Sequence, residues 1–144
     1  MANIMAEKVH AEEVVLSEAE ARRSRDVVVL KSGRAYKVGD VLGKITTAGA
    51  DWGKYALANN YTPATNGTQD AAGVLLQDVD ATEADGEGVA LVRDCQVKGD
   101  LLNYTASTSS ANKAALHDDL QALGIVVRPR IATPSPPPPP PPGP

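Results

Sequence analysis

AAGVLLQDVDATEADGEGVALVRDCQV, residues 71–97, decides the fold class of this chain. Its apolar start predicts a β-strand in residues 71–82, and residues 88–97 read as the partner strand. The intervening DATEADGEG is acidic and carries glycine, which is typical of a hairpin loop. An antiparallel hairpin is therefore expected here, within a small and mainly β domain.

Short apolar runs on either side of this hairpin predict further strands. Residues 27–30 (VVVL) and 41–45 (VLGKI) read as two strands, and residues 125–127 (IVV) read as the last one. In the glycine-bearing loops after the second run, we expect Trp52 and Tyr55 to anchor the chain onto the core.

One helix is predicted in the C-terminal half, across residues 111–124 (ANKAALHDDLQALG). Leu116, Leu120 and Leu123 recur at i, i+4 and i+7, so they form one apolar face. Gly124 occupies the position of a C′ glycine, which ends a helix in a left-handed conformation. The fold class is therefore β-rich α+β.

The chain has 144 residues, enough for one domain with a real core. That core must be built from small aliphatic side chains, because the sequence has no Phe and one Trp. Composition predicts three parts: an N-terminal arm at residues 1–25, a β domain at residues 26–128 and a Pro-rich tail at residues 129–144.

The two terminal segments differ in what they can form. Residues 11–23 (AEEVVLSEAEARR) have good helix propensity, but their apolar positions do not recur at a helical period. A flexible arm that orders on a partner is the other interpretation. The prolines of residues 136–142 form a rigid polyproline II rod of roughly 22 Å that cannot join a sheet.

Charge and composition argue against several classes of partner. The net charge is −4 and the basic residues form no stripe, so nucleic acid is a poor candidate. No apolar run reaches the length of a membrane span, and the N-terminus is no signal peptide. The single Cys95 reads as a small buried hydrophobe in a strand, which fits a soluble protein made in a cytoplasm.

The stretch VGDVLGKIT, residues 38–46, resembles a phosphate-binding loop but does not meet its requirements. A Walker loop needs a glycine five positions before the Gly-Lys pair and a hydroxyl residue after it. Val38 and Ile45 stand at those two positions. The stretch is instead predicted to be a turn at Gly39-Asp40 followed by a strand.

The acidic loop of the hairpin also fails as a calcium site. If Asp78 begins an EF-hand loop, Glu83 falls where glycine is required and Val89 falls where the bidentate Glu should stand. A solvated hairpin tip is the better interpretation, and we expect no metal and no cofactor.

No catalytic constellation is visible in the sequence. His10 and His117 have no partner at metal-ligand spacing, and His117 is expected to be exposed on its helix. Cys95 in an apolar strand is a poor nucleophile without a nearby base. We expect no catalytic residues and no enzyme activity.

Four stretches, taken in order, resemble one family: SRDVVVLKSGRAYKVGDVLGKIT, AAGVLLQDVDAT, GVALVRDCQV and AALHDDLQALGIVVR. They span about residues 24–128 and are similar to the head decoration proteins of tailed bacteriophages, related to protein D of lambda-like phages. The resemblance implies a compact β-barrel or β-tulip-like domain and a structural role. The Pro-rich tail and the long N-terminus depart from the family.

The resemblance also implies partners and a location. Such proteins form homotrimers on the outer surface of the expanded phage head, bind where copies of the major capsid protein meet, and stabilise the head against DNA pressure. The arm is implied to become ordered on the shell, partly by adding a strand to capsid protein, which needs an extended segment. The residues predicted to bind capsid protein are Val14, Val15, Leu16, Glu20, Arg22, Arg23, Arg25 and Asp26.

Two other functions stay open from the sequence. The first is a small β-barrel interaction module that presents its proline tail as a ligand to a protein partner. The second is a hydrolase with an unrecognised site, in which Cys95 is the candidate nucleophile. We expect neither a small-molecule substrate nor a membrane as a partner.

Overall fold

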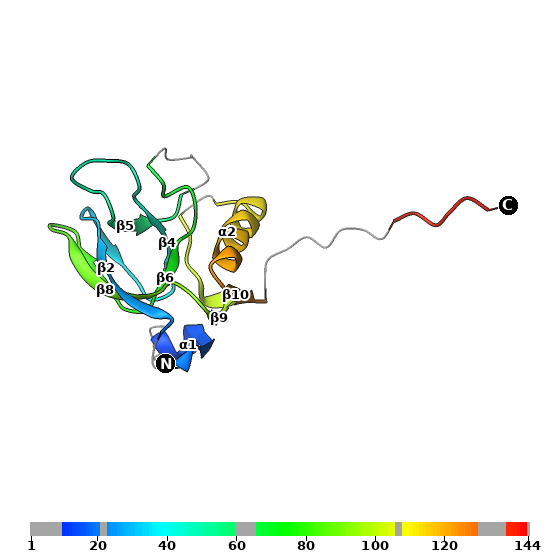
Figure 1. Cartoon of the computed structure of the whole chain (residues 1–144), viewed down its shortest axis with the longest axis horizontal. Helices are drawn as coiled ribbons and strands as arrows, with labels where there is room; N and C mark the ends of the chain where they lie inside the picture. The colour runs from blue at the N-terminus through cyan, green and yellow to red at the C-terminus, as the bar shows by residue number, and fades with distance from the viewer. Residues whose placement is uncertain (1–9, 21–22, 60–65, 106–107, 130–137, 144) are drawn as a thin grey trace, which may run out of the picture.

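The computed structural model describes residues 10–20, 23–59, 66–105, 108–129 and 138–143. Within these residues the fold is mainly β, with ten strands, a closed barrel and one long helix (Figure 1). The prediction of a mainly β fold with one helix in the C-terminal half is confirmed. The barrel strands, in order around the barrel, are β2 (Arg25–Leu30), β5 (Tyr55–Leu57), β4 (Val41–Lys44), β6 (Gly73–Leu75) and β8 (Gly86–Leu91).

A three-stranded sheet lies beside the barrel, in the order β1-β9-β10. Strand β1 pairs with β9 antiparallel, and β10 pairs with β9 parallel. A separate two-stranded ribbon joins β3 to β7. The remaining bounds are α1 (Ala11–Val14), β1 (Val15–Glu18), β3 (Arg34–Tyr36), β7 (Val79–Ala81), β9 (Cys95–Lys98), a 3-10 turn (Gly99–Leu101), α2 (Ser110–Ala122) and β10 (Ile125–Arg128).

Part of the barrel wall is buried on both faces, because the three-stranded sheet and α2 cover its outer side there. Side chains alternate between the faces along a strand. Leu42 and Ala90 therefore belong to the inner core, while Val41 and Leu91 belong to a second, outer core. The outer core is completed by side chains from α1, β9, α2 and β10, including Val14, Val97, Leu116, Leu120 and Ile125.

The predicted hairpin is present only in part. Strands β6 and β8 are antiparallel neighbours, with Val74 opposite Leu91. The predicted loop, however, contains β7, and the predicted partner strand in residues 88–97 is two strands in different sheets. Asp94 explains the break, since its φ of 47° is incompatible with an extended strand.

The predicted helix is confirmed with one correction. The Ser109 side chain accepts a hydrogen bond from the Asn112 N–H and caps α2, and Gly124 has the expected left-handed φ of 83°. Leu116 and Leu120 are buried as predicted. Leu123 is 39% exposed, because the helix ends at Ala122 and Leu123 is already its C-cap.

The VGDVLGKIT stretch is a turn and a strand, as predicted. Gly39 has a φ of 91°, and a Cβ there would collide with the Leu101 carbonyl. The buried Asp40 carboxylate accepts hydrogen bonds from the Lys37 N–H at 2.9 Å and from the Asn103 amide at 3.1 Å. Burial raises the pKa of Asp40 above its ordinary value.

Candidate functional site

Residues 11–18, part of the predicted arm, lie against the domain. Val14 is fully buried at the end of α1 and packs into the outer core. In the following strand, Val15 is opposite Val97 and Glu18 is opposite Cys95. Sequence analysis gave this stretch no buried face, because the surface that covers Val14 comes from strands more than 80 positions later.

A buried serine fixes the connection between β1 and β2. The Ser24 Oγ accepts a hydrogen bond from the Ala19 N–H at 3.0 Å and donates one to the Asp94 carbonyl at 2.7 Å. Ser24 is fully buried, and its own carbonyl accepts from the Val92 N–H. A buried hydroxyl needs such partners. No feature of the sequence near Ser24 indicated this role.

Two of the residues predicted to bind capsid protein, Arg25 and Asp26, form bidentate ion pairs within the chain. The Arg25 guanidinium donates to both Glu18 carboxylate oxygens, at 2.8 and 2.9 Å, and about a quarter of each side chain is exposed. Arg93 donates to both oxygens of Asp26, at 3.2 and 2.6 Å, and to the Arg23 carbonyl. These bidentate contacts hold β1 against β2, and β2 against the end of β8.

The other predicted residues of this region are distributed over its surface. Leu16 is 52% exposed, and Glu20 and Arg23 are exposed as well. Arg23 lies 3.8 Å from Asp94 at the surface. Arg22 lies outside the described residues. The structure therefore brings Val14, Val15, Glu18 and Arg25 together and leaves the side chain of Leu16 facing solvent.

An apolar strip continues from this region along the outside of the barrel. Val27 is 69% exposed and stands directly opposite the half-buried Val89. Val29, two positions along the same strand, is 37% exposed. Sequence analysis read β2 as a strand but did not identify this exposed face. The strip borders a groove of about 380 Å³ lined by Arg25, Asp26, Val27, Leu76, Gln77 and Val89.

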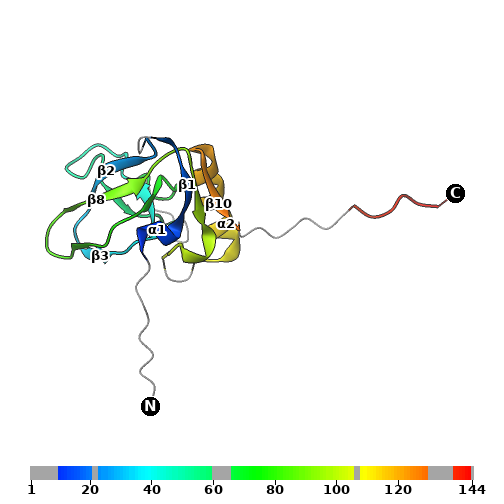
Figure 2. The ribbon, with the colours of Figure 1, turned by 90° about the horizontal axis from the view of Figure 1, so that it is seen from below.

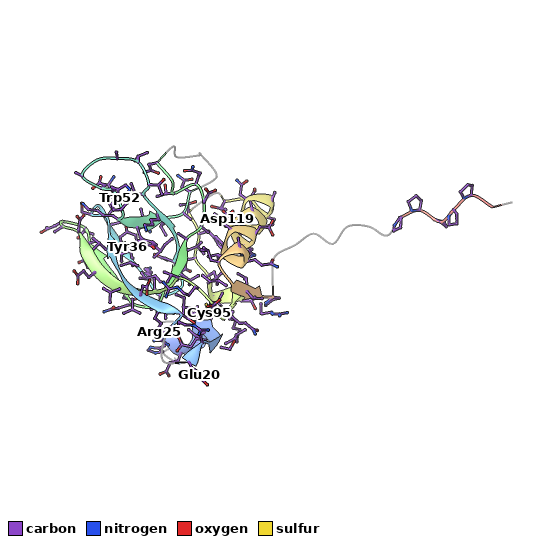
Figure 3. All side chains as sticks on the ribbon, viewed as in Figure 1. Glu20, Arg25, Tyr36, Trp52, Cys95 and Asp119 are labelled. Atoms are coloured by element: carbon purple, nitrogen blue, oxygen red, sulfur yellow. The ribbon has the colours of Figure 1, made fainter. Side chains whose placement is uncertain are left out.

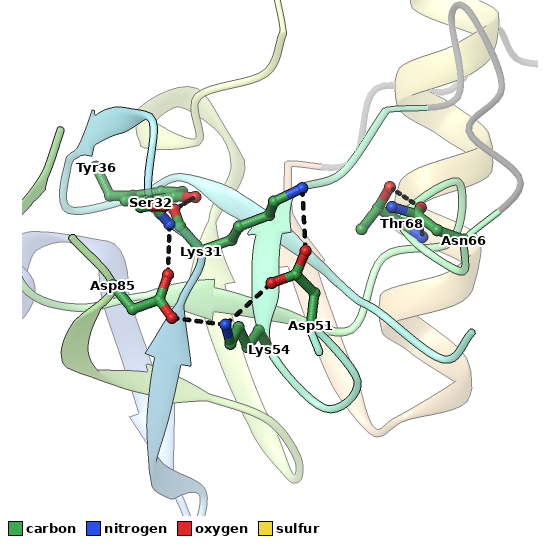
Figure 4. A network of polar contacts seen from close by, with 8 residues as sticks. All are labelled: Lys31, Ser32, Tyr36, Asp51, Lys54, Asn66, Thr68 and Asp85. Atoms are coloured by element: carbon green, nitrogen blue, oxygen red, sulfur yellow. Dashed lines mark hydrogen bonds and ion pairs between the residues drawn. The ribbon is translucent and has the colours of Figure 1, made fainter. Parts of the chain in front are cut away.

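At the end of the barrel away from β1, charged side chains hold the loops together (Figure 4). Lys54 contacts Asp51 at 2.9 Å and Asp85 at 2.6 Å, and Lys31 contacts Asp51 at 3.4 Å. The hydrogen bonds from Lys54 lower the pKa of both carboxylates, and Ser32 N–H adds to the effect on Asp85. Three loops that are distant in sequence are joined in this way.

Of the two aromatic residues expected to anchor these loops, only Tyr55 does so. Tyr55 packs against the inner core. Trp52 is 65% exposed, so the prediction that it anchors the loop onto the core is wrong. The loop that carries Trp52 is fixed by Lys54 and Asp51 beside it, and this polar attachment leaves the indole at the surface (Figure 3).

The residues with reactive side chains are buried in the outer core. Cys95 is 5% exposed, as predicted, and burial, assisted by Glu18 and Asp94, raises its thiol pKa to about 12. A thiol with that pKa is protonated at neutral pH and is a poor nucleophile. His117 is buried against the Tyr104 hydroxyl, so the expectation of an exposed histidine is wrong. His117 lies in the middle of α2, on its buried side with Leu116 and Leu120.

The described residues contain no group of three or more His, Cys, Asp or Glu side chains that could hold a metal ion. None of their helices is long and apolar enough to cross a membrane.

Comparison with known families adds a direct assignment. Residues 4–125 match the family described as bacteriophage lambda head decoration protein D. No curated protein matches the chain. The family match covers the barrel, β1, β9 and α2 and ends at the first residue of β10, so it includes most of the described fold. The chain therefore belongs to the bacteriophage lambda head decoration protein D family, which is a family of structural proteins of the phage head and not of enzymes.

Proposed function

We propose that this protein stabilises a phage head as a homotrimer bound to the outer surface of the expanded shell. The observation that carries the proposal is the family match over residues 4–125. In this proposal each trimer sits at a three-fold or quasi-three-fold position, where neighbouring copies of the major capsid protein meet. It holds them together against the pressure of the packaged DNA.

The proposed mechanism is binding alone, without cofactor, substrate or nucleic acid. A net charge of −4 disfavours contact with the DNA inside the head. Three copies in one trimer act as a multivalent unit, so a modest affinity at each contact still gives slow dissociation. Residues 1–25 are proposed to contact the shell, with residues 26–128 as the trimer-forming domain.

The end of the barrel that carries β1 supports this proposal. It presents an edge strand, the exposed Leu16 and the exposed Val27. Edge strands and exposed apolar patches are features of protein-binding surfaces. The acidic and basic residues beside them are joined in pairs, Glu18 with Arg25 and Asp26 with Arg93.

The test is co-sedimentation of the purified protein with expanded, undecorated capsids, with unexpanded procapsids as the control. Saturable binding to expanded shells alone, together with a trimer in sedimentation velocity, is the expected result. Binding to neither particle, or equal binding to both, would contradict the cementing role. A monomer that binds expanded shells would contradict only the trimer.

The proline tail suggests a second candidate function, an interaction module that presents a polyproline ligand. Residues 138–143 are exposed and lie beyond the domain in two perpendicular views (Figures 1 and 2). Polyproline II segments bind grooves lined by aromatic side chains. Removal of residues 134–144 separates the two candidates: decoration predicts unchanged binding to shells, and a large loss would favour the tail as the binding element.

A further inference from the structure

Two positively charged side chains lie next to each other at the end of the three-stranded sheet. Lys98 is the last residue of β9 and Arg128 is the last residue of β10, and the parallel register places them opposite each other. Neighbouring residues of paired strands point to the same face of a sheet, and like charges so placed repel each other. Lys98 and Arg128 are called the basic site below.

The basic site has no counter-charge among the described residues. Both side chains are exposed, and neither forms an ion pair with the part of the chain that the structure describes, although Asp100 is only two positions from Lys98. Arg25 and Arg93, by contrast, each bind a carboxylate. Arg128 also lines a hollow of about 390 Å³ on the surface. The site is therefore open to a carboxylate from another molecule.

The loop between β7 and β8 carries the opposite charge. Residues 82–85 are exposed, and Glu83 in this loop and Glu87 in β8 form no ion pair with any described residue. Asp85 between them contacts Lys54, but Lys54 also contacts Asp51, so the loop keeps an excess of negative charge. Glu83 and Glu87 are called the acidic site below.

Both sites are held in place before any partner binds. At the acidic site, Asp85 accepts hydrogen bonds from the Lys54 ammonium at 2.6 Å and from the Ser32 N–H at 2.8 Å (Figure 4). At the basic site, Arg128 ends a strand in which Ile125 and Val127 are buried. Surfaces that are already ordered lose less entropy on association.

The two sites lie at opposite ends of the domain. In two perpendicular views, the loop that leads into β8 is at one end of the long axis, and β10 is on the other side with α2 (Figures 1 and 2). They cannot pair within one copy. A contact between different patches of two identical copies is head-to-tail, and it closes into a ring when the rotation between copies allows it.

We infer that the acidic site of one copy docks on the basic site of the next, so that three such contacts close the trimer. The inference rests on the proposed function, because it names the surfaces through which the proposed homotrimer assembles. Complementary charges at an interface fix its orientation and exclude wrong partners. The occupant of the basic site is therefore a second copy of this chain.

Reversing the charge of one site tests the contact. One variant combines Lys98→Glu with Arg128→Glu, and the other combines Glu83→Lys with Glu87→Lys. Each places like charges at all three contacts of a trimer. We expect either variant to raise the protein concentration at which half of the chains are trimeric by about tenfold or more, measured by sedimentation velocity over a dilution series. Trimers as tight as those of wild type in both variants would overturn the inference.

Matched controls carry the same charge changes elsewhere. Lys37→Glu with Lys44→Glu, and Glu12→Lys with Glu20→Lys, reverse exposed side chains outside both sites. Their trimers should dissociate at close to the wild-type concentration. Thermal unfolding of every variant checks that the domain is intact.

Reversing both sites in one chain should restore the trimer, because each contact again joins opposite charges. This result distinguishes a lost contact from a damaged fold. A fourfold variant that is as weakly trimeric as the two single-site variants would show that the two sites do not meet, and the inference would be wrong.

Co-expression of wild type with the fourfold variant gives a test that does not depend on the affinity. Every contact between a wild-type copy and a reversed copy joins like charges, so only uniform trimers should form. Native mass spectrometry separates the species when one form carries a tag. A statistical mixture of mixed trimers would overturn the inference.

The outcomes separate this inference from the function on which it rests. If wild type is a monomer, the proposed trimer and the inference both fail. If wild type is a trimer that charge reversal does not weaken, the inference alone fails. If reversal of the basic site leaves the trimer intact but weakens binding to expanded shells, a capsid protein segment occupies that site and the inference is wrong.

Discussion

The two ends of the barrel are held together by different forces. At one end, α1 and β1 are joined to the domain by the buried Val14 and by the buried Ser24 hydroxyl. At the other, Lys54 joins two exposed loops through carboxylates, beside an exposed Trp52. Figure 3 shows Arg25 and Trp52 at these opposite ends.

The difference indicates which end is a fixed part of the fold. Burial of a Val side chain stabilises a protein by about 1.5–3 kcal/mol, and exposed ion pairs contribute about 0–1 kcal/mol each. The end that buries Val14 and Ser24 is therefore expected to be the more firmly held. A segment that composition alone describes as an arm becomes part of the core because one valine reaches the outer core.

The largest expected effect comes from Val14→Ala compared with Trp52→Ala. Val14→Ala should lower the free energy of unfolding by about 2 kcal/mol, because it leaves a cavity in the outer core. Trp52→Ala should change it by about 0.5 kcal/mol or less, since the indole is exposed.

Urea denaturation measures both changes, and alkylation of Cys95 reports specifically on β1. Iodoacetamide should label Cys95 faster in Val14→Ala than in wild type, because β1 opens more often. A larger loss of stability for Trp52→Ala than for Val14→Ala would reverse the comparison.

A smaller effect is expected from the ion pair at the β1 end. A double-mutant cycle with Glu18→Gln and Arg25→Gln should give a coupling energy of about 1 kcal/mol, because the pair is bidentate and partly buried. The same cycle with Lys54→Met and Asp85→Asn should give a smaller coupling, since Lys54 contacts one carboxylate oxygen of Asp85 and does not form a bidentate pair. Equal couplings at the two ends would argue against the bidentate geometry as the cause.

The smallest effect is the response of the loop end to acid. The pKa values of Asp51 and Asp85 are lowered by Lys54, so these carboxylates stabilise the folded state above their unfolded pKa of about 3.9. That contribution is lost as pH falls through the lower, folded pKa values. Lys54→Met should therefore lower the urea midpoint at pH 7 and differ less from wild type at pH 3.

Lys44→Met is the matched control for this comparison, since Lys44 is an exposed lysine outside the network. Its midpoint should stay close to that of wild type at both pH values. An unchanged difference between Lys54→Met and wild type at pH 3 would show that the loops are not held by these carboxylates.

Much of the fold could be predicted from the sequence, and the candidate surface only in part. The strands β2 and β4, the turn at Gly39 and the helix α2 all follow from residues close together in the chain. The resemblance to head decoration proteins was also visible, because it rests on the order of such segments. The predicted burial of Trp52 and the predicted exposure of His117 were wrong, since exposure depends on what packs against each side chain.

The sequence by itself determined the local elements and the family, because caps, turns and periodic apolar positions act over a few residues. Only the tertiary structure decided that β1 pairs with β9, that Ser24 bonds to a carbonyl 70 positions away, and that Val27 stays exposed beside a groove. Hydrogen-bond partners and burial arise between segments distant in the chain, and a local pattern carries no information about which segments meet.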